Sequence, residues 1–113
     1  MTLEDVIRWT KVQGRARRAP LGPHIDHILT TIEAVGYTFG SLRGLVYGLI
    51  RFGTYLHEQG ITDLDQLRFR YVESFVATQP LRQFRSYRYP DSPGVRGARY
   101  LWRYVCAAGI TEP

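Results

Sequence analysis

From position 23 onward, the apolar residues recur at the spacing of one helix face. Pro23 suits the first position of a helix and Gly36 a C-terminal cap, so the pattern predicts a helix over 23–35. Asp26 and Glu33 fall on the opposite side, which is therefore predicted to be an acidic face in solvent. The predicted inward positions are Ile25, Ile28, Leu29, Ile32 and Val35.

A longer helix is predicted from the N-cap Thr38 to about position 59, with Gly60 as a left-handed cap. Glycines recur at every fourth residue in its first half, although each costs about 1 kcal/mol relative to alanine in a helix interior. We therefore expect a neighbouring helix to approach closely there. The glycines are Gly40, Gly44 and Gly48. The predicted core positions are Leu42, Leu45, Val46, Leu49, Phe52 and Leu56.

Two more helices follow in the pattern. Residues 61–66 are predicted to form a turn with a short helical piece, and a third helix covers Phe69–Thr78. The segment 81–91 alternates arginines with aromatic residues and is predicted to be an ordered loop. A fourth helix is expected to begin with Ser92 as its cap and to end at Gly109. The predicted inward positions are Val72, Phe75 and Val76 in the third helix and Val95, Ala98, Leu101, Trp102 and Val105 in the fourth.

The first 22 residues lack such a pattern. A short apolar stretch is followed by GRARRAPLGP, in which Arg15, Arg17 and Arg18 stand among glycine and proline. We therefore expect a flexible basic N-terminal arm over 1–22. A chain of 113 residues has room for one domain, and no segment alternates apolar and polar residues as a strand does. The predicted fold is all-α: a compact four-helix bundle over 23–113, preceded by the arm.

Arginine dominates the charge of the chain. Of the 15 basic residues 14 are arginine, and they outnumber the 10 acidic residues to give a net charge of +5. The planar guanidinium of arginine forms paired hydrogen bonds with phosphate and with guanine edges. The arginines of the second and fourth predicted helices fall on one exposed arc each, which is typical of a face that binds double-stranded DNA. The candidate contacts are Arg43, Tyr47, Arg51, Arg85, Arg88, Arg96, Arg99 and Arg103.

The residues offer little for catalysis. His24 and His27 are three positions apart but have no third ligand on their side, and no histidine is placed to activate Cys106. No glycine-rich phosphate loop, carboxylate pair or Ser-His-acid set occurs. We therefore expect no enzymatic activity, metal, cofactor or small-molecule substrate. The single cysteine and the lack of a signal peptide or an apolar run of ~20 residues indicate a cytoplasmic protein outside membranes.

Four segments of the chain resemble the N-terminal core-binding domain of tyrosine recombinases, the lambda-type phage integrases. This domain is often called SAM-like. The resemblance rests on helix lengths, the F-x-x-Y-L-x-x-x-G-I run and the D-L-x-x-L turn, and it covers roughly residues 23–113. The segments are HIDHILTTIEAVGYT, SLRGLVYGLIRFGTYLHEQGI, TDLDQLRFRYVESFVA and GARYLWRYVCAAGITEP.

The resemblance implies an orthogonal four-helix bundle that forms one half of a C-shaped clamp around duplex DNA at a recombination core site. The second and fourth helices would face the major groove with the arginines named above. DNA breakage and rejoining would belong to a separate C-terminal catalytic domain, so no tyrosine of this chain is expected to be the nucleophile. The parent protein would support DNA integration and recombination with further recombinase protomers, associated with the nucleoid of a bacterium or archaeon. The chain would be either a fragment of such a recombinase or a stand-alone relative.

Other functions stay open at this point. A stand-alone helix-turn-helix regulator or architectural protein would dimerise and prefer a palindromic site. A protein-interaction module would instead dock a partner through the aromatic loop at 81–91. The tyrosines that alternate with the arginines either stack on unpaired bases or are half-buried packing residues with their hydroxyls in water.

Overall fold

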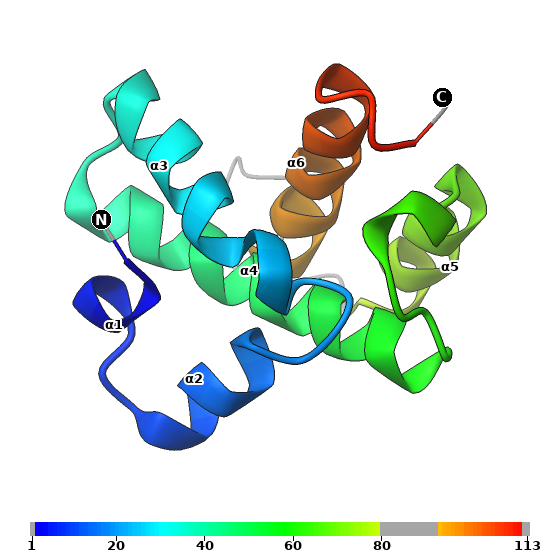
Figure 1. Cartoon of the computed structure of the whole chain (residues 1–113), viewed down its shortest axis with the longest axis horizontal. Coiled ribbons are helices and arrows are strands. Elements are labelled where there is room, and N and C mark those ends of the chain that lie inside the picture. Colours follow the sequence, from blue (N-terminus) through cyan, green and yellow to red (C-terminus); the bar gives the residue numbers. More distant parts are fainter. Residues whose placement is uncertain (1, 80–92, 112–113) are drawn as a thin grey trace, which may run out of the picture.

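The computed structural model describes residues 2–79 and 93–111. Within these residues the chain forms six α-helices and two short 3₁₀ helices, with no strand, so the predicted all-α class is confirmed (Figure 1). The elements are α1 Leu3–Val6, α2 Thr10–Ala16, η1 Gly22–His24, α3 Ile25–Val35, α4 Phe39–Glu58, η2 Leu64–Gln66, α5 Phe69–Thr78 and α6 Pro93–Ala107.

Helix α4 crosses the middle of the molecule, and the other helices pack around it (Figure 1). The side chain of Thr38 accepts a hydrogen bond from the backbone N–H of Ser41, which caps the helix as predicted. At the other end Gly60 has φ 80°, the left-handed conformation expected there. All six predicted core positions of this helix are buried, and the ring of Phe52 lies 5.0 Å from that of Phe75 on α5.

Helices α4 and α6 pack closely where they cross. A Cβ atom added to Gly97 of α6 would lie 2.2 Å from the carbonyl carbon of Gly48 and 2.4 Å from the backbone nitrogen of Leu49. The predicted close approach of a neighbouring helix is therefore confirmed at Gly48. It is wrong for Gly40 and Gly44, because a Cβ at either position would meet no described atom within 4 Å.

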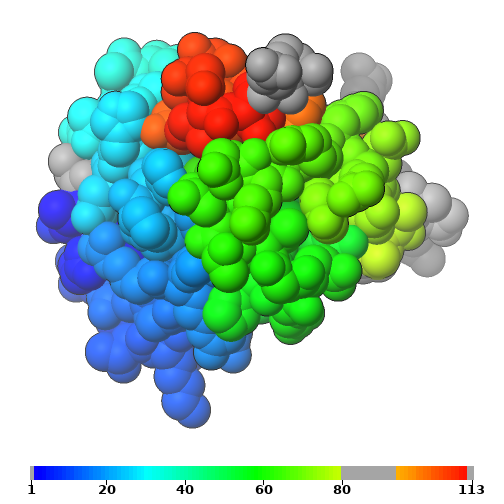
Figure 2. All heavy atoms as spheres, turned by 45° about the vertical axis from the view of Figure 1, so that its right-hand side comes forward, coloured from blue at the N-terminus to red at the C-terminus, as the bar shows by residue number. Residues whose placement is uncertain are grey.

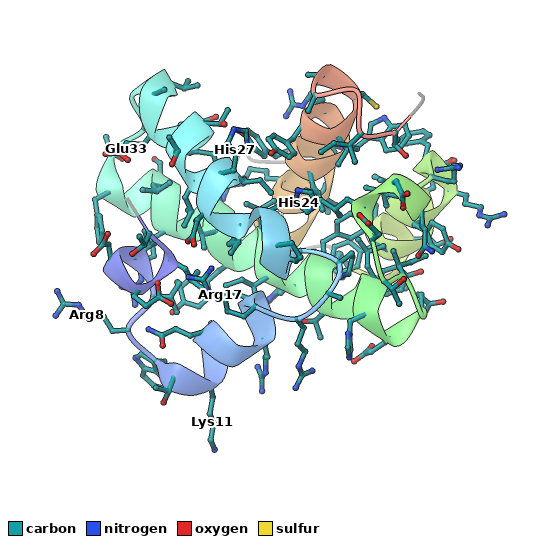
Figure 3. The ribbon with its side chains drawn as sticks, viewed as in Figure 1. Arg8, Lys11, Arg17, His24, His27 and Glu33 are labelled. Atoms are coloured by element: carbon teal, nitrogen blue, oxygen red, sulfur yellow. The ribbon has the colours of Figure 1, made fainter. Side chains whose placement is uncertain are left out.

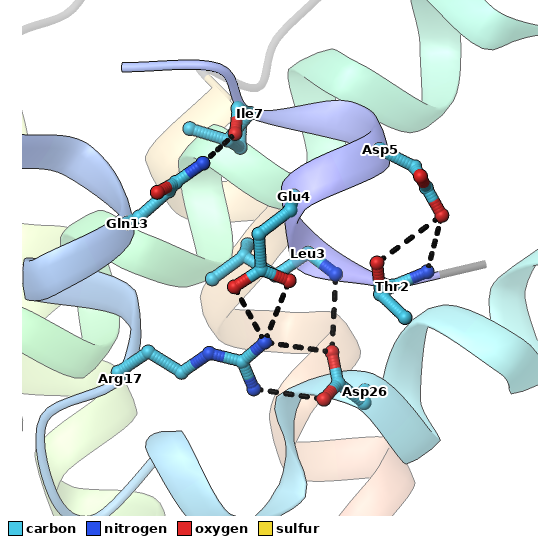
Figure 4. A network of polar contacts seen from close by, with 8 residues as sticks. All are labelled: Thr2, Leu3, Glu4, Asp5, Ile7, Gln13, Arg17 and Asp26. Atoms are coloured by element: carbon cyan, nitrogen blue, oxygen red, sulfur yellow. Dashed lines mark hydrogen bonds and ion pairs between the residues drawn. The ribbon is translucent and has the colours of Figure 1, made fainter. Parts of the chain in front are cut away.

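The expected flexible arm at 1–22 is wrong for the described residues 2–22, which contain α1 and α2. Their apolar side chains belong to the same core as those of α3 and α4. The contacts that hold this segment join residues far apart in the sequence: Leu3 donates its backbone N–H to the carboxylate of Asp26, and Arg17 pairs with both Glu4 and Asp26 (Figure 4). The buried residues of this segment include Leu3, Val6, Ile7, Ala16 and Leu21.

Helix α3 ends at Val35 as predicted, with Gly36 as its cap in the left-handed conformation (φ 91°). It begins at Ile25 rather than at position 23, because Gly22–His24 form the 3₁₀ helix η1. Two expectations about its faces are wrong. Val35 was expected in the core but is 69 % exposed, because the last turn of α3 extends past the elements that cover its other apolar residues. Asp26 was expected on a free solvent face, but α1 and Arg17 lie against it.

The third and fourth predicted helices correspond to α5 and α6. Val72 and Phe75 are buried as predicted, and the side chain of Val76 is partly buried. After α6 the chain turns at Gly109, and the hydroxyl of Thr111 donates to the backbone carbonyls of Asp65 and Leu67. Figure 2 shows this C-terminal turn (red) lying between α3 (light blue) and the segment around η2 (green). The predicted loop at 81–91 and the predicted cap Ser92 lie outside the described residues.

Candidate nucleic-acid interface

Helix α4 carries the first group of predicted contacts, which we call the α4 row: Arg43, Tyr47 and Arg51. Their spacing of four residues keeps them within an arc of about 80°. Both arginines are exposed, and neither forms an ion pair with a described residue. The guanidinium of Arg43 lies over the ring of Tyr47, 5.6 Å from its centroid. The ring therefore orients one guanidinium of the row without neutralising its charge.

Helix α6 carries the second group, the α6 row: Arg96, Arg99 and Arg103. These residues occupy an arc of about 60°, and all three side chains are exposed on the side opposite the core. Nε of Arg103 donates to the backbone carbonyl of Arg99 at 3.4 Å, which orients the side chain along the helix. Arg96 and Arg103 form no ion pair with the described residues.

The two rows lie on helices that touch. Gly48 faces α6 on one side of the exposed arc of α4, and Gly53 faces Leu21, in the connection between α2 and α3, on the other. The α4 row occupies the arc between these two contacts. Helix α6, which carries the α6 row, therefore borders the α4 row on one side. Helix α2 borders it on the other side.

Among the described residues, the carboxylates that form ion pairs with arginine lie on α1 and α3. Glu4 and Asp26, from α1 and α3, both accept hydrogen bonds from Arg17 at 2.8 to 3.3 Å (Figure 4). The hydrogen bonds from Arg17 hold the pKa of both carboxyl groups below their ordinary values, and the two carboxylates, Asp26 first, raise the pKa of Arg17. Arg17, at the C-terminal end of α2, thus links this helix to α1 and α3 through its two ion pairs. It is unlike the arginines of the α4 row, which keep their positive charge unpaired within the described chain.

An open depression of about 380 Å³ lies beside the α4 row, between α2, α4 and α5. Arg15 of α2 and Arg51 of α4 both line it, and Thr54, Thr78 and Gln79 supply further polar groups. The other described lining residues are Ile50, Tyr55, Glu58 and Phe75, so Glu58 is the one carboxylate among the described residues of the lining. The depression joins a cation of the α4 row to a cation outside both rows.

The two candidate histidine ligands have different partners in the fold. His27 shares a hydrogen bond of 2.5 Å between its Nδ1 and the hydroxyl of Tyr104, which links α3 to α6. His24 lies 4.0 Å from a carboxylate oxygen of Asp63 (Figure 3 labels both histidines). Cys106 is a free thiol, partly buried against the core. In the described ranges 2–79 and 93–111, no three potential metal ligands come together.

Several tyrosines near the rows contribute part of their side chains to the packing of the core. Tyr47, Tyr55, Tyr100 and Tyr104 are partly buried against the core. Burial raises the pKa of the Tyr100 hydroxyl, and the nearby Tyr37 and Tyr104 raise it further, whereas Arg103 lowers it.

Two predicted contacts, Arg85 and Arg88, lie outside the described residues. The exposed positions of the other candidates followed from helical periodicity. The sequence analysis did not predict that the cations of α2 belong to an ordered helical surface. The four-residue spacing of Lys11 and Arg15, which is that of one helix face, was the signal that could have indicated it.

A scan against protein-family models found no match, and neither did searches of the curated proteins and of the solved structures. Among the described residues, no helix combines the length and the apolar character that crossing a bilayer requires.

Proposed function

We propose that this chain is a duplex-DNA-binding domain. The observation that carries the proposal is the pair of arginine rows on the touching helices α4 and α6, in which Arg43, Arg51, Arg96 and Arg103 form no ion pair with a described residue. Unpaired guanidinium groups on one exposed surface are free to exchange bound counterions for DNA phosphates, which is the main source of affinity in DNA binding.

The resemblance stated above refines the proposal to the core-binding domain of a tyrosine recombinase. Helices α3 to α6 would be its SAM-like orthogonal bundle, with α4 and α6 toward the major groove. The chain would position a separate catalytic domain on a recombination site, act beside further recombinase protomers in the cytoplasm, and itself break no bond. The helix lengths and the two capping glycines of α3 and α4 support this refinement.

The proposal is tested by neutralising the α6 row. We expect the variant Arg96→Gln/Arg99→Gln/Arg103→Gln to bind a duplex of about 30 bp more weakly at every sequence tested, and its slope of log affinity against log salt to fall by up to about 2.7, since each phosphate contact contributes about 0.9. The matched control is Arg70→Gln, an exposed arginine of α5 outside both rows that stacks on Tyr71. An unchanged slope in the triple variant would contradict the assignment of α6.

A second measurement, the mass of the complex on DNA, separates the proposal from a stand-alone regulator. A regulator of the helix-turn-helix type binds two half-sites as a dimer. A measured mass of two chains on DNA, together with a palindromic preferred site, would favour the regulator over a recombinase domain.

A further inference from the structure

A third group of cations lies on α2 and in the turn that follows it, and we call it the α2 row: Lys11, Arg15 and Arg18. Lys11 and Arg15 are four residues apart, so they lie on the same helix face, one turn from each other. All three residues of the row are exposed, and none forms an ion pair with a described residue. Lys11 projects away from the body of the molecule, whereas Arg17 points back toward α1 (Figure 3).

The α2 row is joined to the α4 row by the depression described above. Arg15 and Arg51 line the same hollow from two different helices, and the polar residues Thr54, Thr78 and Gln79 also line it. Two guanidinium groups and several neutral polar groups are a suitable environment for a phosphate. Glu58 is the one carboxylate among the described lining residues, so two guanidinium groups face one carboxylate there.

We propose that the α2 row extends the DNA-binding surface beyond α4, so that the sugar-phosphate backbone of a duplex continues across the depression and onto α2. This inference rests on the proposed function. Arg15 and Arg51 would hold phosphates on the two sides of the hollow, and Lys11 and Arg18 would hold phosphates farther along the strand. Because the contacts are to phosphates, they position the protein without reading sequence.

A membrane surface is a poorer fit to the α2 row, although the neighbouring Trp9 is 70 % exposed. A helix that lies on a bilayer inserts its apolar face among the lipids. The apolar face of α2 is already used inside the protein, because Ala16 is buried and Val12 packs against the core. What α2 presents to its surroundings is therefore its charged face.

The test is the variant Lys11→Gln/Arg15→Gln/Arg18→Gln, compared with Arg70→Gln, in fluorescence anisotropy with a duplex of about 30 bp at several salt concentrations. We expect the slope of log affinity against log salt to fall by up to about 2.7 in the triple variant and to stay unchanged in the control. A triple variant with the wild-type slope would overturn the inference. So would a wild-type chain that binds vesicles containing phosphatidylserine through these three residues while the variant keeps its duplex affinity.

A gain of charge provides a second readout that does not depend on removing side chains. Gly14 lies on the exposed side of α2, and a Cβ there would meet no described atom within 4 Å. We expect Gly14→Arg to raise the salt slope by about 0.9, and an unchanged slope would count against the inference.

The two proposals fail in different ways. If the wild-type chain binds no duplex at low salt, the proposed function fails and this inference fails with it. If the wild type binds and only the α6 variant lowers the slope, the proposed function stands and the α2 row takes no part.

Discussion

The crossing of α4 and α6 gives the sharpest prediction about stability, the substitution Gly97→Ala. The added Cβ would lie 2.2, 2.4 and 2.6 Å from three backbone atoms of Gly48 and Leu49. Ordinary contact begins near 3.4 Å, so the helices must separate by about 1.2 Å at this point. Overpacking of this kind costs about 3 kcal/mol at its upper range, and the better helix propensity of alanine offsets about 1 kcal/mol, which leaves a loss of about 2 kcal/mol.

The measurement is urea denaturation followed by circular dichroism, with Gly44→Ala as the matched control. Gly44 is in the interior of α4, one turn before Gly48, but its Cβ would meet no described atom within 4 Å. We therefore expect the control to be more stable than the wild type by up to about 1 kcal/mol. If Gly97→Ala unfolds at the same urea concentration as the wild type or at a higher one, the close crossing is not present in solution.

Two further predictions concern the ion pairs of the N-terminal helices and the cap of α4. Because hydrogen bonds from Arg17 lower the pKa of Glu4 and Asp26 from 4.5 and 3.8, their stabilisation is present above these values and is lost as the pH falls through the lower folded-state pKa values. We expect Arg17→Gln to flatten this acid limb in denaturation curves measured across pH, and an equally steep limb in the variant would contradict the pairing. Thr38→Ala removes the hydrogen bond to Ser41 and should cost about 1 kcal/mol of unfolding free energy, measured by urea denaturation; an unchanged midpoint would show that the cap does not form.

The helices that could be predicted from the sequence are those whose signals are local. Helix α4 has both a capping threonine and a left-handed glycine, and its core positions recur over about four turns, so its bounds and its buried face follow from periodicity. The exposed arcs that carry the α4 and α6 rows follow from the same periodicity. Their binding to DNA stays a prediction.

The parts that the sequence did not reveal depend on contacts between distant residues. Helix α1 has four residues, which is too short to show a period, and it is held by the bond from Leu3 to Asp26, 23 residues away. The cations in and after α2 stand among glycine and proline, a sequence pattern typical of a flexible arm. Only the structure shows that Arg17 bonds to the carboxylates of Asp26 and Glu4 and so fixes this segment. Likewise, the spacing of the glycines in α4 indicates close packing, but only the position of Gly97 on another helix shows that Gly48 is the contact.

The central claim is that the exposed arginine surface on α4 and α6 binds duplex DNA. It is tested most directly by fluorescence anisotropy of the wild-type chain with a duplex of about 30 bp and with a single strand of equal length, each titrated across salt. The account predicts preference for the duplex and a log affinity that falls linearly with log salt, by about 0.9 for each phosphate neutralised. The absence of duplex binding at low salt, or equally tight binding of the single strand, would contradict it.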